Sequence, residues 1–526
     1  MTMKKVLSLA LAIALVVGLF AGVRPASAET KDFFMVLQVG FKQYALNGLP
    51  LASEVAPEII SGRTFVPVRL ITETYGAVVD WNPASRTVTI KLGEVEVILT
   101  IGSKEAIVGS ETKLLEAAPY IKAGRTMVPL RLISEAFGLS VYYDSQTKSI
   151  SIKSKTTGVV PGITGNQILI GSFSVQTGPY AVVGIPFSHG MQSYFNMVNE
   201  AGGVYGRKIN LKVEDDGFNP AKTVTIVKKF VTEDKVFAVV GGLGTPGCLA
   251  VMDYLNDQKV PFVYQASGVS KIAIPAKNYV FAVQPNYINE GQIFAKYVAS
   301  TLGLKNIAVL YSNDDAGNEG LKGIKLGVDK YGGKIVVESP FPATETDFTS
   351  YLLKVQASNA DALILYATGV ATGGNVVKTA KSLGLTQKIF LPYPHSGIIA
   401  TAGAAADGVY VTGWVDFSNL TDPGVAKFFA TWRKYYPKDD PLTFSYAVAG
   451  WVAAEVFTEA VRRSGPYPTR DSLVWALETF NGWSGYLAKD ISYGPNERSG
   501  KYSMFFMQVQ KGALVKVSDW ISVLKP

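Results

Sequence analysis

Blocks of apolar and polar residues alternate along residues 168–413 and predict strands that are followed by helices. Short apolar runs such as "ILIGSFS" and "NIAVLYS" are typical of buried strands, and apolar residues at helical spacing follow most of them. The predicted strands are 168–174, 208–217, 236–240, 260–268, 306–312, 334–339, 361–367, 388–392 and 408–413; the predicted helices include 186–201, 220–232, one through 331, one from 348, and 370–383.

This alternation predicts parallel sheets with right-handed crossover connections. Two successive series, before and after Leu304, predict two α/β lobes. The default ligand site of such a chain is the crevice between the lobes, at the carboxyl ends of the strands.

Residues 62–153 contain an internal repeat. "GRTFVPVRLITETYGAVVDWNPASRTVTIK" (62–91) realigns on "GRTMVPLRLISEAFGLSVYYDSQTKSISIK" (124–153). Each copy predicts a short strand with a proline, an amphipathic helix that ends at a glycine, and an alternating strand. We therefore expect a small α+β domain over residues 34–153, in which both copies share one core. Residues 154–166 contain glycine, proline and threonine without apolar periodicity, which is typical of a linker.

The first 28 residues have the pattern of a secretory signal. Lys4 and Lys5 precede an apolar run, and "ASA" at 26–28 suits signal peptidase. An uncleaved membrane anchor is the alternative. No cysteine follows the apolar run, so we expect a secreted, cell-surface or wall-associated protein that is not a lipoprotein.

Composition narrows the possible partners. The formal charge of +8 falls by three to +5 once the signal and its three basic residues are removed, an excess that could favour anionic wall polymers. No basic run interleaved with aromatic residues suggests nucleic-acid binding. Cys248 is the one cysteine, so no intramolecular disulfide is possible and stability must come from a buried core.

The glycine motif in "VFAVVGGLGTPGCLAVMDYL" (236–255) is compatible with two functions. Gly242, Gly244 and Gly247 have the spacing of a dinucleotide-binding loop. That loop normally opens its domain and is followed by an acidic residue, whereas this motif follows a third strand and the next strand ends in "YQAS". We expect the start of the following helix to receive a small carboxylate instead. A glycine turn needed only for strand–helix packing is the alternative.

Two resemblances agree with this division. The signature "GRTxVPxRxIxExxG" resembles the copper amine oxidase N-terminal-like, or stalk, domain of Gram-positive surface proteins. Copper(II) favours imidazole ligands, but both histidines, His189 and His395, lie outside this region, so we expect no metal site and a spacer or wall-associated role.

Residues 167–516 resemble the type I periplasmic binding proteins of the Leu/Ile/Val-binding family. The motifs are "NEAGGVYGRKINLKVEDDGFNPAKTV", "FAVQPNYINEGQIFAKYV", "KNIAVLYSNDDAGNEGLKGIK" and "YAVAGWVAAEVFTEAVRRSG". The resemblance implies a two-lobed α/β fold over 167–520, with one lobe from about 167–285 and 415–495 and the other from about 287–413 and the C-terminal segment. It also implies capture of a small solute for the permease of an ABC importer, without a cofactor.

The resemblance also implies site residues. Thr245 matches the hydroxyl residue that binds the ligand carboxylate. The next strand end, which offers backbone groups and a hydroxyl, matches Ala266, Ser267 and Gly268. Tyr180 lies on the loop after the first strand, where the family places residues over the ligand.

The acidic side chains expected for a ligand ammonium are replaced. Tyr287 stands where the family often has an aspartate, and "YPH", which ends at His395, stands where a carboxylate often follows. Ala316 replaces a common aromatic. The ligand is therefore either an amino acid held differently or a neutral or aromatic carboxylate or amide.

No hydrolase, metalloprotease or phosphate-loop motif is present, so we expect a binding protein and not an enzyme. The alternative function is a wall-associated ligand sensor or adhesive surface protein without a transport role, since the repeat domain is unusual for a transport component.

Overall fold

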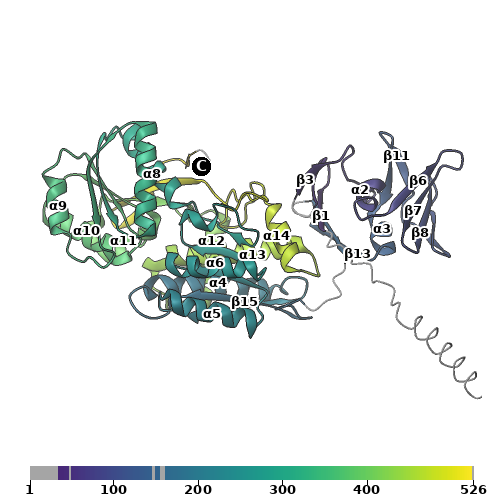
Figure 1. Cartoon of the computed structure of the whole chain (residues 1–526), viewed down its shortest axis with the longest axis horizontal. Helices are drawn as coiled ribbons and strands as arrows, with labels where there is room; N and C mark the ends of the chain where they lie inside the picture. Colours follow the sequence, from purple (N-terminus) through teal and green to yellow (C-terminus); the bar gives the residue numbers. More distant parts are fainter. Residues whose placement is uncertain (1–33, 47–48, 145–147, 155–159, 524–526) are drawn as a thin grey trace, which may run out of the picture. The chain divides into compact units, whose positions relative to one another are not determined.

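A computed structural model describes residues 34–46, 49–144, 148–154 and 160–523. The expected signal peptide and residues 155–159 of the expected linker lie outside the described residues. The chain forms two compact units: residues 54–141 with short end segments, and residues 36–53, 142–151 and the chain from 160 on (Figure 1).

The centre of the first unit is a pair of equivalent strands. β5 (Arg63–Pro67) pairs antiparallel with β12 (Arg125–Pro129), and Val66 lies opposite Val128, its counterpart in the other copy of the repeat. β4 (Glu58–Ile60) and β11 (Tyr120–Lys122) complete this sheet in the order β11-β12-β5-β4. Phe65 and Met127, also counterparts, are buried in one cluster. The two copies therefore share a core, as the repeat predicts.

Each "VP" pair ends a strand and starts a helix. Pro67 and Pro129 are the N-cap residues of α2 (Val68–Thr72) and α3 (Leu130–Ala136), with φ of −59° and −60°. The proline ring fixes this φ, which directs the chain from the strand into the helix. A second sheet has the order β10-β9-β8-β7-β6, with bounds Val78–Asn82 (β6), Thr87–Leu92 (β7), Val95–Thr100 (β8), Glu105–Val108 (β9) and Glu111–Leu114 (β10).

A third N-terminal sheet combines strands from the start and the end of the repeat region. Its order is β13-β14-β1-β2-β3, with bounds Phe34–Gln38 (β1), Gln43–Leu46 (β2), Leu49–Ala52 (β3), Leu139–Asp144 (β13) and Ser149–Ser154 (β14).

The first lobe of the second unit is a parallel sheet between helices. The order is β16-β15-β17-β18-β19, with bounds Gln167–Ser174 (β15), Lys208–Asp215 (β16), Ala238–Leu243 (β17), Phe262–Ala266 (β18) and Val280–Phe281 (β19). β17 is buried along its whole length, because helices cover both faces of the sheet (Figure 1). The helices are α4 (Ala181–Glu200), α5 (Pro220–Thr232), α6 (Thr245–Asp257), α12 (Pro423–Tyr435), α13 (Phe444–Ser464) and α14 (Arg470–Glu478).

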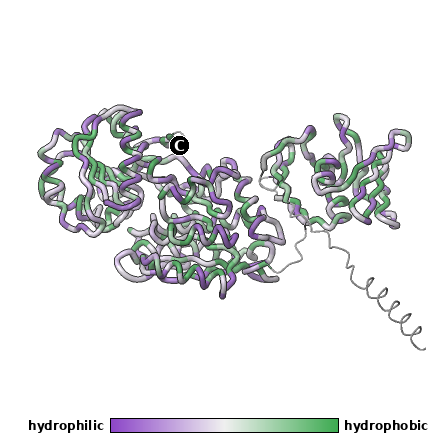
Figure 2. Tube along the Cα trace, viewed as in Figure 1, coloured by the Kyte–Doolittle hydropathy of each residue, from purple (hydrophilic) through white to green (hydrophobic). Residues whose placement is uncertain are grey.

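The second lobe repeats the arrangement and adds antiparallel strands at one edge. The order is β21-β20-β22-β23-β24-β25-β26, with β27 beside β25. Figure 2 shows hydrophobic stretches along its inner strands. The strands are Asn306–Ser312 (β20), Lys334–Phe341 (β21), Ala362–Tyr366 (β22), Lys388–Leu391 (β23), Tyr410–Gly413 (β24), Ser503–Gln510 (β25), Ala513–Lys516 (β26) and Ile521–Ser522 (β27); the helices are α7 (Tyr287–Ala295), α8 (Asp315–Tyr331), α9 (Thr349–Gln356), α10 (Val370–Ser382) and α11 (Ile398–Ala402).

In both lobes, the second strand along the chain lies on one side of the first strand and the third strand lies on the other side. β16 lies on one side of β15 and β17 on the other, and β21 and β22 flank β20 in the same way. Loops at such a switch point diverge and leave a crevice at the carboxyl ends of the strands.

Two predicted elements differ from the observed bounds by three residues or more at one end. α4 begins at Ala181, five residues before the predicted start at Pro186, which lies inside the helix. Proline is typical of a first helical turn, so the pattern favoured a later start; here its missing hydrogen bond is tolerated in a well-buried helix. β17 continues through Gly241 and Gly242 to Leu243 instead of ending at Val240, because glycine lowers strand propensity without preventing pairing.

The described chain crosses between the lobes after β19, after β24 and before β25. Arg498, 1% exposed, holds the first and last crossings together: its guanidinium donates to the Lys277 carbonyl at 2.8 Å and pairs with Glu478 at 2.7 Å. Backbone bonds also join Ala282 to Arg498 and Gly500, each at 2.9 Å.

A glycine contact between α4 and α13 gives a stability test. A Cβ on Gly450 would lie 1.9 Å from the Phe187 carbonyl oxygen, so the helices must separate to accept it. We expect Gly450→Ala to lower the free energy of unfolding by about 1–3 kcal/mol, although alanine favours helices. Gly165→Ala, where no atom lies within 4 Å of the new Cβ, is the control. Urea unfolding measures both; equal stabilities would contradict the close contact.

Candidate ligand-binding cleft

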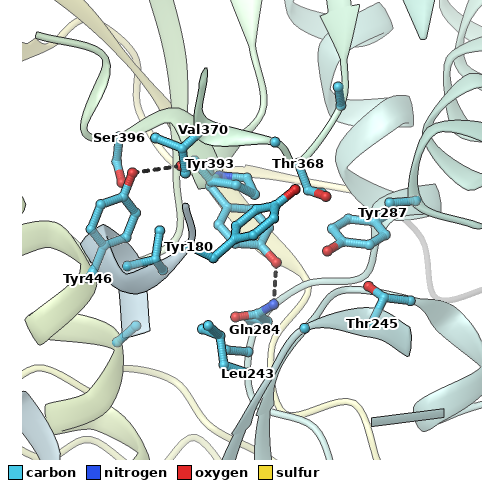
Figure 3. A pocket seen from close by; sticks show the side chains of 18 of the residues that line it. Tyr180, Leu243, Thr245, Gln284, Tyr287, Thr368, Val370, Tyr393, Ser396 and Tyr446 are labelled. Carbon is cyan, nitrogen blue, oxygen red and sulfur yellow. Dashed lines mark hydrogen bonds between the residues drawn. The ribbon is translucent and has the colours of Figure 1, made fainter. Parts of the chain in front are cut away.

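A cavity of about 310 Å³ lies between the two lobes. Part of its lining comes from the loops after β15 and β17 in the first lobe and after β20 and β22 in the second, which are the loops at the two switch points. Other lining residues come from β18, from the segments after β19, β23 and β24, and from α13. Figure 3 shows Tyr180, Tyr287 and Tyr393 around this space, with Thr245 at one side. The volume is in the range of small-molecule sites, which begins at roughly 300 Å³.

Aromatic rings and uncharged polar groups dominate the lining. Among the described lining residues, Asp314 and Asp315 carry charge and none is basic. The aromatic lining residues are Tyr180, Phe187, Phe218, Tyr264, Tyr287, Phe341, Tyr393, Trp414, Phe417 and Tyr446. Such a wall suits a flat or apolar body with few polar groups.

The first-lobe polar group lies at the start of α6. Thr245 is the first residue of this helix, and its N-cap, Gly244, supplies no side-chain cap. The Thr245 hydroxyl lies 2.7 Å from the Ser267 hydroxyl, and Ser267 is 2% exposed. The first N–H groups of a helix need acceptors outside it, and the helix dipole favours a negative one. This arrangement can receive a carboxylate.

The three glycines of the sequence motif serve packing. A Cβ on Gly242 would lie 2.3 Å from the Phe173 ring, one on Gly244 2.5 Å from the Phe218 ring, and one on Gly247 2.8 Å from the Thr223 hydroxyl. Gly244 also has a φ of 102°, which side chains rarely adopt. The packing alternative therefore accounts for the glycines, while the motif residues Leu243–Pro246, with Thr245 among them, line the cavity.

An aromatic pair covers the first-lobe side. Phe218 stacks on Tyr180, with ring centroids 4.2 Å apart and planes 12° from parallel. The loop that presents Phe218 turns around Asp216, whose carboxylate accepts from the Phe218 N–H at 3.0 Å and the Thr223 hydroxyl at 2.7 Å. Burial raises the pKa of Asp216. The "EDDGFNP" stretch thus positions an aromatic wall.

The second-lobe wall is built around a buried carboxyl group. Glu290 is fully buried and accepts from the Tyr366 hydroxyl at 2.6 Å, the Tyr393 N–H at 2.9 Å and the Thr412 hydroxyl. Burial raises the pKa of Glu290 to about 7, although these donors oppose the rise. Glu290 is not among the lining residues. It therefore holds α7, β22, β24 and the Tyr393 loop together from behind the wall.

Gln284 connects the two lobes at the first crossing. Its carbonyl oxygen accepts from the Tyr264 hydroxyl of the first lobe at 2.9 Å, and its amide donates to the Tyr393 hydroxyl of the second lobe (Figure 3). Burial raises the pKa of both tyrosines, so the hydroxyls stay protonated at neutral pH.

His395 lies beside the cavity and not in its lining. It is 1% exposed, and its Nε2 donates to the Ala367 carbonyl at 2.9 Å. Burial lowers the pKa of His395 to about 4, so it is neutral at neutral pH. The strand-end position suggested a side chain in the cleft, but the short 3₁₀ turn Tyr393–His395 directs this ring into the second lobe.

The structure brings together most of the predicted site residues. Thr245, Ala266, Tyr287 and Tyr180 line the cavity. Ser267 contacts Thr245 from behind, and Gly268 lies under the Tyr287 ring, which is 2.6 Å from where its Cβ would be. Their roles in binding remain predictions.

Sequence reasoning did not select several lining residues. Gln284, Phe218, Thr368, Gly369, Thr372 and Ser445 line the cavity. Thr368 and Gly369 follow the predicted strand 361–367, so the strand-end rule could have found them; the others depend on loop and helix packing.

Comparison with known proteins decides the family. The family model described as periplasmic binding protein matches residues 167–513, about two thirds of the chain. The chain belongs to the periplasmic binding protein family. A second model, the copper amine oxidase N-terminal domain, matches residues 45–152. Both resemblances inferred from the sequence are confirmed.

Two relatives of known sequence are distant from this chain. An amino acid binding protein of Pseudomonas aeruginosa is 24% identical over 42% of this chain and 59% of its own length. The Leu/Ile/Val-binding protein of Escherichia coli is 21% identical over 47% of this chain and 67% of the relative. The relatives are binding proteins, and this chain is accordingly a binding protein and not an enzyme.

Solved structures of the family share the two-lobed fold. A fatty acid ABC transporter substrate-binding protein from Thermomonospora curvata superposes with a TM-score of 0.62 at 23% identity, covering 70% of this chain and 95% of that one. A branched chain amino acid ABC transporter protein from Thermus thermophilus with bound valine gives 0.61 at 21%, covering 69% and 98%. The TM-scores establish the fold, and the low sequence identities leave the solute undetermined.

The copper in the name of the N-terminal family does not fit these residues. Copper(II) favours imidazole, and both histidines of the chain lie outside residues 45–152. Across the described ranges, no helix has the length and apolar character needed to cross a membrane.

Glu290 gives a pH-dependence test. Its folded pKa of about 7 lies above the ordinary 4.5, so the folded state holds a proton that the unfolded state releases between these values. Its stability contribution is complete below pH 4.5 and is lost as pH rises through 7, by about 3 kcal/mol. We expect Glu290→Gln to flatten the fall in unfolding free energy between pH 5 and 7.5, measured by urea unfolding. Glu455, with the same pKa, supplies a second comparison, Glu455→Gln. An unchanged slope in both variants would contradict the prediction.

Proposed function

We propose that this protein captures a small carboxylate-bearing solute outside the cell by closing its lobes on it, and delivers the solute to an ABC permease. The observation that carries the proposal is the Thr245–Ser267 hydroxyl pair at the uncapped start of α6, facing a cavity between two lobes. The helix dipole and the N–H groups of the first turn favour an anion without a basic side chain.

Contacts across the cleft support closure. The Ser270 N–H and hydroxyl donate to the Glu319 carboxylate on α8 at 2.7 and 2.6 Å. The backbone N–H of Tyr287, at the start of α7, donates to the Gly268 carbonyl at 2.7 Å. Because Ser270 and Gly268 follow β18 of the first lobe, these bonds join opposite lobes and would break when the cleft opens.

The names of the relatives point to the same chemical group. One relative binds leucine, isoleucine and valine, and one structural neighbour is a fatty acid transport protein. These solutes share a carboxylate and an apolar body. A carboxylate receiver in the first lobe and an aromatic wall elsewhere would suit that common chemistry.

Thr245→Ala tests the receiver. A thermal-shift screen of the secreted protein against amino acids, aromatic acids and short amides first identifies the tightest solute. Loss of a charge-assisted hydrogen bond should then weaken its binding about ten- to a hundredfold in titration calorimetry. Thr225→Ala, an exposed threonine on α5, is the matched control. Wild-type affinity in Thr245→Ala would refute the receiver.

For the N-terminal region we propose a spacer that also associates with cell-wall glycan. Trp81 and Tyr143 occupy equivalent positions of the two copies, on β6 and β13, and each is 38% exposed. A chain that keeps an exposed aromatic in both copies offers two similar apolar spots, and such surface rings suit contact with a repeating polymer.

The wall proposal predicts a surface effect. We expect the double variant Trp81→Ala, Tyr143→Ala to reduce co-sedimentation of the full secreted protein with purified peptidoglycan at least threefold. Leu114→Ala, at an 80% exposed residue of the same region, should leave it unchanged. Equal sedimentation of the wild type and the double variant would refute a role for the two aromatics.

A further inference from the structure

The start of α10 is a second uncapped helix end at the cavity, opposite α6. Gly369 is its N-cap and supplies no side-chain cap, whereas α7 and α8 of the same lobe are capped by Asn286 and Asp314. Gly369, Val370 and Thr372, all from this end of the helix, line the cavity. The N–H groups of a first helical turn require an acceptor from outside the helix.

Two buried hydroxyl groups at the cavity also have no partner. Thr372, in the first turn of α10, is 8% exposed, and its side chain makes no hydrogen bond within the described part of the chain. Ser445, at the start of α13, is 8% exposed, and its hydroxyl has no partner there either. Leaving the buried Ser445 hydroxyl unpaired costs stability, and the Thr372 hydroxyl on the cavity lining is free to bond a ligand.

Acceptors in the same wall already receive donors. The Ala367 carbonyl receives His395 Nε2 at 2.9 Å, and the Pro394 carbonyl receives the Tyr446 hydroxyl at 3.1 Å. The carboxyl of Glu290 is enclosed behind the wall by its own donors. This side of the cavity therefore offers N–H and O–H groups at the start of α10, and its acidic lining residues lie at the start of α8. No described lining residue of the first lobe is acidic, so an ammonium beside a carboxylate at α6 meets no acidic side chain of that lobe.

The acidic residues of the lining limit the charge of the incoming group. Oδ1 of the Asp314 carboxylate accepts from the Gly317 N–H at 2.8 Å and the Ser312 hydroxyl at 2.9 Å as the cap of α8. Asp315 lies 3.8 Å from Lys271 Nζ. Their negative charges disfavour a second anion in this lobe, so the donors of α10 suit a neutral acceptor.

We propose that the solute is an apolar or aromatic monocarboxylate without an ammonium group, whose far end carries an uncharged oxygen acceptor. This inference rests on the proposed function, which places the carboxylate at α6. The far oxygen, from a hydroxyl, carbonyl, amide or ether, accepts from the first turn of α10 and from Thr372. The aromatic rings between the two helix ends enclose the body of the solute.

Three probes separate the two features of this solute class. Tyrosine and 3-(4-hydroxyphenyl)propionate differ by the ammonium, and 3-phenylpropionate lacks the far oxygen. In titration calorimetry with the full secreted protein, we expect 3-(4-hydroxyphenyl)propionate to bind at least tenfold more tightly than tyrosine. We expect it to bind about fivefold more tightly than 3-phenylpropionate, the effect of one neutral hydrogen bond.

Thr372→Val tests the receiving group while keeping the side-chain shape. The variant should reduce the affinity for 3-(4-hydroxyphenyl)propionate to about that for 3-phenylpropionate, whose own binding should not change. Thr379→Val, further along the same helix and outside the cavity lining, is the matched control and should change neither.

The possible outcomes distinguish this inference from the proposed function. Tyrosine binding as tightly as its des-amino partner, or an equal loss for both propionates in Thr372→Val, would overturn the inference and leave carboxylate capture intact. If none of the three probes binds while another carboxylate from the screen does, the far-end assignment is also wrong. If no carboxylate in the screen binds at all, the proposed function itself fails.

Discussion

Parallel pairing is the constraint on which the cleft depends. In a parallel sheet every strand ends at the same edge, so the helix that follows it begins there and directs its free N–H groups and positive dipole end to that edge. Both lobes follow this rule. At the switch point of each sheet, two such loops run to opposite sides and leave a crevice between them. The crevices of both lobes contribute to one cavity. Hydrogen-bond donors therefore gather in the cleft without any basic side chain in the described lining.

The two sides of the cavity are stabilised by different means. In the first lobe, glycines at the end of β17, before α6 and in its first turn pack against Phe173, Phe218 and Thr223, so close packing fixes the backbone. In the second lobe, the buried Glu290 carboxyl group collects donors from three elements. Gln284 then joins a tyrosine from each side. The polar contacts behind the wall leave the described cavity surface largely aromatic, with Asp314 and Asp315 as its acidic residues.

The sequence predicted features that depend on local pattern. Apolar runs located strands such as Asn306–Ser312, and an Asn-Pro pair located the start of α5 at Pro220. The motif around Thr245 predicted a residue that lines the cavity. The direction of the His395 side chain could not be predicted from the strand pattern, because a short 3₁₀ turn after the strand determines it. Glu290 and Gln284 could not be selected from the sequence, since their importance comes from partners more than a hundred residues away.

The pairing of Val66 with Val128 has a consequence for how the N-terminal region assembles. β5 and β12 pair symmetrically about Val66 and Val128. The two joined surfaces are therefore self-complementary, like the interface of a symmetric dimer. Placing both surfaces on one chain replaces association between molecules by association within one, at a high effective concentration set by the connecting segment. Folding of this region is thereby independent of protein concentration.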